Sequence, residues 1–167
     1  MFKQLFAGLL LSVMYPLFVV AAAADGLYIG ARAGIIKNDT SGFDNATNAG
    51  VALGYEFLNV GVGDVAIEGE YTTTIDEGNA PGISDWETDT MAVYGVLRTG
   101  GPVYVQAKAG VINQKLDVGA ISNDDTGFTV GLGIGFSLAV AQFELQYTRM
   151  EEDIDFVGIG INIKTPF

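Results

Sequence analysis

The feature that most constrains this chain is an alternation of large apolar residues with small or polar ones. In residues 128–138, Phe, Val, Leu and Ile occupy the even positions, and Thr, Gly and Ser occupy the odd positions. A strict period of two predicts β-strands, because successive side chains of a strand point to opposite faces of the sheet. The same alternation recurs in six further segments, residues 27–35, 49–57, 65–73, 103–111, 142–148 and 157–164.

Residues 90–98 have the composition of an eighth strand, but two sets of side chains compete for its apolar face. The sequence leaves the choice between them open. The sets are Met91, Val93 and Leu97 on one side, and Ala92, Tyr94 and Val96 on the other.

The connections between these strands alternate in length. Short turns are predicted near residues 59–64, 99–102 and 139–141, and longer polar loops near residues 37–48, 75–88, 113–126 and 150–155. Clusters of Asn, Asp, Gly and Ser are typical of loops. This order predicts an antiparallel up-and-down meander with all short turns at one end.

Eight alternating strands fit two kinds of barrel. A soluble barrel hides its large apolar residues inside, whereas a membrane barrel turns them toward lipid and fills its lumen with small or polar groups. Gly131, Gly133 and Gly135 line the second face of one strand. Glycines weaken strands and solubilise nothing on a surface, but they suit a narrow lumen. The sequence therefore predicts an all-β fold, an eight-stranded antiparallel up-and-down transmembrane β-barrel.

Aromatic residues near strand ends on its apolar face fit an interfacial girdle: Tyr55, Phe57, Tyr71, Phe128, Tyr147 and Phe167.

Residues 1–24 have the pattern of a secretory signal peptide. Lys3 precedes an apolar run, and four alanines end at Ala24. An uncleaved membrane helix is the alternative, but Pro16 and the alanines favour cleavage. Cleavage before Asp25 leaves residues 25–167 as a single barrel domain.

The signal peptide, the opening strand Tyr28–Gly34 and the closing segment Phe156–Phe167 together resemble those of a known family. It comprises small outer-membrane β-barrels of the OmpA-transmembrane, OmpX and opacity-protein type. The resemblance implies an integral protein of the bacterial outer membrane, with termini in the periplasm and longer loops outside. It implies that the terminal Phe167 is the signal that the outer-membrane assembly machinery recognises. Outer-membrane lipid and lipopolysaccharide are the expected surroundings, and a monomer is expected.

The small-residue face also carries ionisable groups, and these are the candidate site residues. Charges in a narrow interior need ionic or hydrogen-bonding partners. One interpretation is a salt-bridge network that fills the barrel; the other is an ion path through a small pore. The resemblance favours the network. The predicted interior residues are Arg32, Glu56, Glu68, Glu70, Lys108 and Glu144, with Lys164 as a further candidate.

Composition excludes several classes of function. The chain has no His and no Cys, which removes His-dependent catalytic triads and zinc sites. No catalytic residue, cofactor or metal site is predicted. The net charge of -12 argues against nucleic-acid binding. The carboxylates of Asp124–Asp125 or Glu151–Asp153 are candidate calcium ligands, but their spacing fits no EF-hand. Arg149 is expected to reach a lipid phosphate.

These features favour a non-enzymatic outer-membrane protein that contributes to envelope structure and carries loops for interaction or adhesion. A narrow channel for ions or small solutes is the alternative.

We expect the mature protein to begin at Asp25. Intact-mass spectrometry of protein isolated from the membrane should give the mass of residues 25–167. A mass that includes residues 1–24 would show that the segment is retained as an anchor.

Deletion of Phe167 should reduce insertion into the outer membrane, because the resemblance makes this residue the assembly signal. The amount of folded barrel in outer-membrane fractions measures the effect. Normal assembly of the truncated chain would refute this role.

Overall fold

The computed structural model describes residues 26–38, 44–80, 84–118, 121–151 and 154–165. The predicted signal peptide and Phe167 lie outside these residues. The described part is built from strands, and none of its helices is long and apolar enough to span a membrane. The strands are β1 (Leu27–Asn38), β2 (Ala46–Asn59), β3 (Gly63–Asp76), β4 (Gly78–Ala80), β5 (Ser84–Thr99), β6 (Val103–Val118), β7 (Ile121–Leu138), β8 (Ala141–Glu151) and β9 (Ile154–Lys164).

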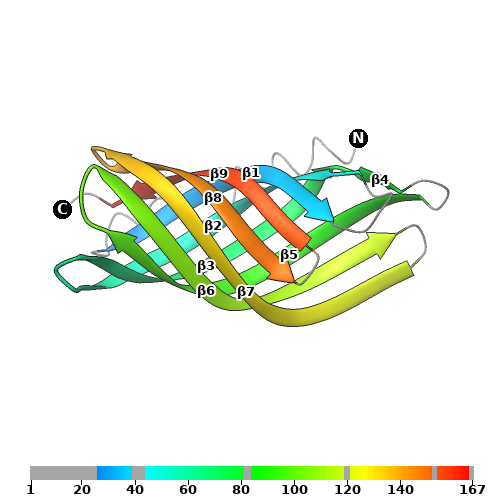
Figure 1. Ribbon diagram of the computed structural model, residues 1–167, viewed down its shortest axis with the longest axis horizontal. Helices are drawn as coiled ribbons and strands as arrows, with labels where there is room; N and C mark the ends of the chain where they lie inside the picture. Colours follow the sequence, from blue (N-terminus) through cyan, green and yellow to red (C-terminus); the bar gives the residue numbers. More distant parts are fainter. Residues whose placement is uncertain (1–25, 39–43, 81–83, 119–120, 152–153, 166–167) are drawn as a thin grey trace.

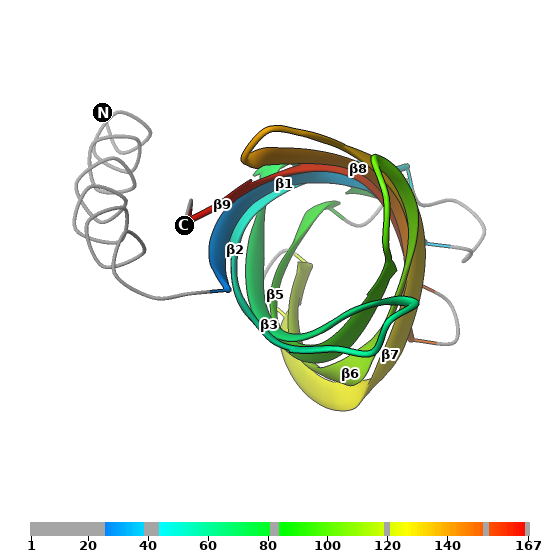
Figure 2. The same ribbon diagram turned by 90° about the vertical axis from the view of Figure 1, so that its left-hand side faces the viewer.

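The eight long strands close into a barrel. Each pairs antiparallel with its neighbours in the chain, and β9 pairs with β1. β3 pairs directly with β5, because the short β4 that separates them in the sequence does not lie between them in the sheet. The sheet therefore returns on itself, as the view along the barrel shows (Figure 2). Among the described strands, the three-residue β4 pairs only with β5. The predicted eight-stranded antiparallel up-and-down barrel is confirmed.

The two ends of the barrel differ, as the sequence predicts. The turns after β2, β5 and β7 lie together at what we call the turn end, on the left in Figure 1. These turns use left-handed backbone, with φ of 80° at Gly61, 115° at Gly101 and 54° at Ala139. The opposite end, which holds the longer connections, is called the loop end.

The wall is much taller on one side than on the other. β5, β6 and β7 have 16, 16 and 18 residues, whereas β1, β8 and β9 have 12, 11 and 11. The prediction of loops at residues 75–88 and 113–126 is largely wrong, because β3, β4 and β5 include most of the first segment and β6 and β7 most of the second. At these positions the strands continue with polar side chains, beyond the band of exposed apolar residues that surrounds the barrel, which we call the apolar belt. We call residues 85–91, 113–118 and 121–128 the projecting sheet; it extends on the right in Figure 1.

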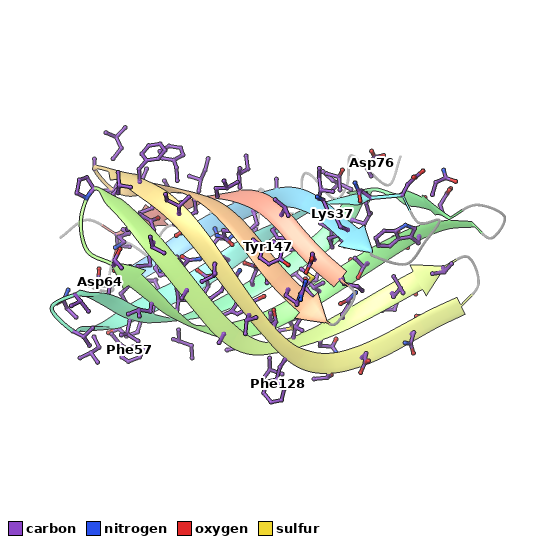
Figure 3. All side chains as sticks on the ribbon, viewed as in Figure 1. Lys37, Phe57, Asp64, Asp76, Phe128 and Tyr147 are labelled. Carbon is purple, nitrogen blue, oxygen red and sulfur yellow. The ribbon has the colours of Figure 1, made fainter. Side chains whose placement is uncertain are left out.

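The outer face of the barrel is apolar. In β5, Met91, Val93 and Leu97 are 43–66% exposed, while Ala92, Tyr94 and Val96 are at most 3% exposed. The structure thereby settles which face of this strand is outside. Tyr55, Phe57, Tyr71, Phe128 and Tyr147 from the predicted girdle are also exposed; Figure 3 shows Phe57 near the turn end and Phe128 pointing outward from β7.

The barrel interior is narrow, and large side chains fit there because some of the neighbouring residues are glycines. A Cβ atom at Gly158 would lie 2.5 Å from Cζ of Phe156 and 2.6 Å from the carbonyl oxygen of Ala33. The glycine of β9 thus lets the Phe156 ring lie flat against the inner wall. Gly34 of β1 lies beneath the same ring.

Candidate functional site in the barrel interior

The structure places the predicted charged residues on the inner face of the barrel. Arg32 of β1, Glu68 and Glu70 of β3, Lys108 of β6 and Glu144 of β8 are each at most 5% exposed. The strand alternation explains this placement, since all five share a face with small residues. Glu56 lies nearer the turn end, and its side chain is 15% exposed.

Arg98 of β5 belongs to the same interior, and the sequence prediction missed it. Its Nε lies 3.0 Å from Glu144 Oε1, and its Nη2 lies 3.3 Å from Glu68 Oε2. Its guanidinium also stacks 4.7 Å from the centre of the Tyr28 ring. The residue was missed because the two faces of residues 90–98 could not be told apart. Once Val96 is known to face inward, Arg98 follows two residues later.

Arg32 and Lys108 complete the pairing from the other side. Arg32 Nη2 lies 3.1 Å from Glu68 Oε2, and its Nε lies 3.3 Å from Glu70 Oε2. Lys108 Nζ lies 3.3 Å from the same oxygen of Glu70 and 4.3 Å from the centre of the Tyr94 ring. Each cation therefore contacts at least one carboxylate.

We call these six residues the interior charge cluster: Arg32, Glu68, Glu70, Arg98, Lys108 and Glu144. Three cations balance three carboxylates, and two hydroxyls donate further hydrogen bonds. Tyr28 donates to Glu68 at 2.8 Å, and Tyr104 donates to Glu144 at 3.0 Å. All six side chains are 0–3% exposed. The charges are therefore almost completely shielded from water, and each ionised group depends on its charged partners.

A further ion pair continues the cluster toward the turn end. Lys164 Nζ lies 2.7 Å from Glu56 Oε1, and Arg98 Nη1 lies 3.8 Å from the same oxygen. The Lys164 side chain is 29% exposed. This ion pair is therefore accessible to solvent, whereas the interior charge cluster is buried.

Near the loop end the interior holds large apolar residues beside the predicted small and polar ones, which include the buried Asn48, Thr72 and Thr88. Inward-facing residues from five strands pack together there at no more than 8% exposure; we call them the apolar plug. Large apolar residues fit because the flanking Gly34 and Gly158 leave space for the Phe156 ring. The plug consists of Ile36, Trp86, Ile112, Met150, Ile154 and Phe156.

Trp86 also ties the plug to the connection between β1 and β2. Its indole Nε1 donates a 3.0 Å hydrogen bond to the carbonyl oxygen of Asp44. A buried indole N–H needs such a partner.

The acidic residues of the loop end do not assemble a metal site within the described residues. Asp124 accepts a 2.6 Å hydrogen bond from Asn113, and Asp117 pairs with Lys115 at 2.8 Å. The hydrogen bond from Lys115 lowers the pKa of the Asp117 carboxyl below its usual value. The calcium hypothesis at residues 151–153 concerns side chains outside the described part.

Comparison with known proteins connects this fold to a family. The model of the outer membrane protein beta-barrel domain matches residues 6–164. No curated protein matches the sequence.

Three solved structures share the architecture. Neisserial surface protein A aligns with a TM-score of 0.57 at 15% identity, over 84% of this chain and 97% of that chain. The N-terminal barrel domain of OprF from Pseudomonas aeruginosa aligns with a TM-score of 0.54 at 15% identity, over 83% and 97%. The outer membrane enzyme PagL aligns with a TM-score of 0.52 at 14% identity, over 82% and 99%. At these identities the similarity shows the fold alone.

Replacing Arg98 by Met should destabilise the barrel by about 3–5 kcal/mol, because Glu68 and Glu144 lose a buried counter-charge. Urea unfolding in micelles, followed by fluorescence of the single tryptophan, Trp86, measures the change.

The matched double variant R98M/E144Q removes one charge of each sign and should recover part of that loss. Arg149→Gln, on the outer surface, should have little effect. An R98M protein as stable as the wild type would contradict the energetic role of the cluster.

Proposed function

Because the chain belongs to the outer membrane protein beta-barrel domain family, we propose that it is a non-enzymatic structural component of the bacterial outer membrane. Its loop end provides an interaction or adhesion surface. In this arrangement the turn end and both termini face the periplasm, and the projecting sheet faces outside. The barrel acts as a monomer, since its edges are closed by its own strands within the apolar belt.

The observation that carries this proposal is the filled interior. The six charged side chains of the interior charge cluster are at most 3% exposed, and their charges balance one another. The apolar plug covers them toward the loop end. An ion moving through such an interior would have to break buried pairs and displace packed aromatic rings. The arrangement therefore favours a structural network over the alternative function, a narrow channel.

The residues also support a role without catalysis. The sequence contains no His, and each carboxylate of the interior charge cluster is paired with a cation. The similarity to the outer membrane enzyme PagL shows that the fold itself is compatible with catalysis. The proposal therefore rests on the side chains of this chain.

Refolded protein in planar lipid bilayers should show no reproducible single-channel openings, because the buried charge cluster and the apolar plug lie across the path. Heat-denatured protein serves as the control for bilayer leakage. A stable unitary conductance would overturn the structural proposal in favour of the channel.

The outer surface offers a contact for lipopolysaccharide phosphates. Arg149 of β8 lies on the outer face, where Asp155 and the Tyr147 hydroxyl hold its Nε and Nη2 at 3.1 and 3.2 Å. Lys37 of β1 is in register with Asp155 from the other side. Two exposed cations thus flank one carboxylate next to the apolar belt, at the position where headgroup phosphates meet protein. Lipopolysaccharide is the phosphate-bearing lipid that we propose for this contact.

The double variant K37Q/R149Q should lose its preference for phosphorylated lipid. Native mass spectrometry can compare retention of bisphosphorylated and dephosphorylated lipid A. Lys115→Gln, which removes an exposed cation from the projecting sheet, should leave the preference unchanged. Equal retention of the two lipids by the wild type would contradict this contact.

A further inference from the structure

The apolar belt contains a groove on the wall formed by β7, β8 and β9, which lie side by side in Figure 1. The groove has a volume of about 470 Å³. Small-molecule sites in proteins have volumes of about 300–1,000 Å³, so the groove is large enough for part of one lipid molecule. It faces away from the barrel interior, and two rows of outward-facing side chains bound it.

The row farther from the turn end consists of aliphatic side chains, and we call it the aliphatic row. Ile134, Leu145 and Ile159 are in register on the three strands and line the groove. Each of these side chains is 53–61% exposed on the outer face. The aliphatic row therefore presents branched hydrocarbon to whatever lies in the groove.

The row nearer the turn end contains two aromatic rings, and we call Phe136, Phe143 and Ile161 the aromatic row. The Phe136 and Phe143 rings stack with their centroids 4.9 Å apart and an angle of 15° between their planes. Ile161 continues the row on β9, and Val103 of β6 extends it on the other side. Because the stacked rings stabilise one another, this wall of the groove is preformed.

The floor of the groove is backbone. It is formed by Gly135, Gly160 and the main chain of Glu144, whose carboxylate turns inward to pair with Arg98. The backbone groups of these residues belong to the hydrogen-bonded ladders between the strands. An occupant has to be apolar along its whole length, since a polar group in the groove would lack hydrogen-bonding partners.

The groove lies toward the turn end of the barrel. The aromatic row is two residues from Leu138 and Ala141, where β7 ends and β8 begins. Two residues of a strand cover about 7 Å. With the turn end in the periplasm, as proposed above, this depth belongs to the periplasmic leaflet. Glycerophospholipids form that leaflet of an outer membrane.

We propose that the groove holds one acyl chain of a glycerophospholipid and thereby keeps that lipid bound to the barrel. The inference rests on the proposed function, which sets the orientation of the barrel. The groove is continuous with the apolar belt, so lipid chains meet it directly. If it were unfilled, its side chains would lack contacts on one side, and a hydrocarbon chain restores those contacts.

The acyl chain, not the headgroup, provides the recognition. Leu138, Ala141 and Ile163 form the next outward-facing row, between the groove and the turn end. None of these three residues carries a charge that could select a headgroup. This site thus differs from the contact at Lys37 and Arg149, where phosphate is the recognised group.

A second copy of this chain fits the groove less well. The wall of a barrel is convex, so only a few side chains of a neighbouring barrel could enter a groove on three strands. A stable interface between two proteins buries at least about 1,200 Å² in total. A single acyl chain, in contrast, is flexible enough to follow the groove along its length.

Native mass spectrometry of the purified barrel, released from detergent micelles, tests this proposal. The probe is dipalmitoyl phosphatidylethanolamine. One matched lipid, dipalmitoyl phosphatidylglycerol, keeps the chains and changes the charge of the headgroup. Another, dihexanoyl phosphatidylethanolamine, keeps the headgroup and shortens the chains. Bisphosphorylated lipid A represents the lipid of the other leaflet.

We expect the barrel to retain one dipalmitoyl lipid, equally well with either headgroup, and the dihexanoyl lipid at least tenfold more weakly. A photoactivatable diazirine in the acyl chain of the retained lipid should label the groove residues of β7, β8 and β9. Labels spread evenly around the barrel would overturn the proposal, as would retention that follows the headgroup instead of the chain.

Two variants locate the lipid in the groove. Leu145→Trp places a large ring in the groove and should weaken retention about tenfold. Phe143→Ala removes one of the stacked rings and should weaken retention about fivefold. Val93→Trp is the matched control, because it adds the same ring to the apolar belt on β5, outside the groove. It should retain the lipid like the wild type.

Heat-modifiable mobility on gels verifies that each variant is folded, and Phe143→Ala keeps the test informative if Leu145→Trp is not. Undiminished retention by folded Leu145→Trp would overturn the proposal. Concentration-dependent dimers that this variant abolishes would assign the groove to a second copy instead. If the variant lost lipid A but kept the phospholipid, the assignment to the periplasmic leaflet would be wrong.

These results are separate from the other experiments. K37Q/R149Q should retain the phospholipid like the wild type, because its altered residues lie near the loop end. A sealed barrel that retains no phospholipid refutes the groove site alone, and a conducting barrel refutes the structural role alone.

Discussion

In the hydrocarbon core of a membrane every backbone N–H and C=O group needs a partner within the protein, and a sheet provides all of them only when it closes. Here closure is achieved by the β1–β9 pairing and by the β3–β5 pairing that bypasses β4. Closure then fixes the rest of the architecture. It gives each strand one lipid face and one inner face, and it limits the interior to the width that eight strands enclose.

That narrow interior explains its unusual contents. Charged side chains cannot be hydrated there, so three cations and three carboxylates neutralise one another within hydrogen-bonding distance. The Phe156 ring fits because the inward-facing residues beside it are Gly34 and Gly158. The glycine content of the sequence and its buried charges thus have a common cause. A filled, neutral interior suits a protein whose activity lies at its surface.

Beyond the apolar belt, water can satisfy backbone groups and closure is no longer required. The wall becomes uneven at this level, because β5, β6 and β7 continue after β1, β8 and β9 have ended. The edge of β7 is left without a neighbour among the described residues, and its side chains change from apolar to acidic. The same strand therefore contributes to a sealed barrel at one end and to an exposed sheet edge at the other.

The sequence by itself determined the strand count, the alternation and the placement of Arg32, Glu68, Glu70, Lys108 and Glu144 on the inner face, because a period of two assigns faces without knowledge of the fold. It could not place Arg98, since the apolar residues of β5 are similar on both faces and only pairing with β3 and β6 decides between them. It also mistook polar strand extensions for loops, because hydrophobic alternation ends where the membrane ends while backbone pairing continues. The contacts among the charges, the packing of the apolar plug and the unpaired end of β7 all depend on the register between distant strands. That register exists only in the closed tertiary structure.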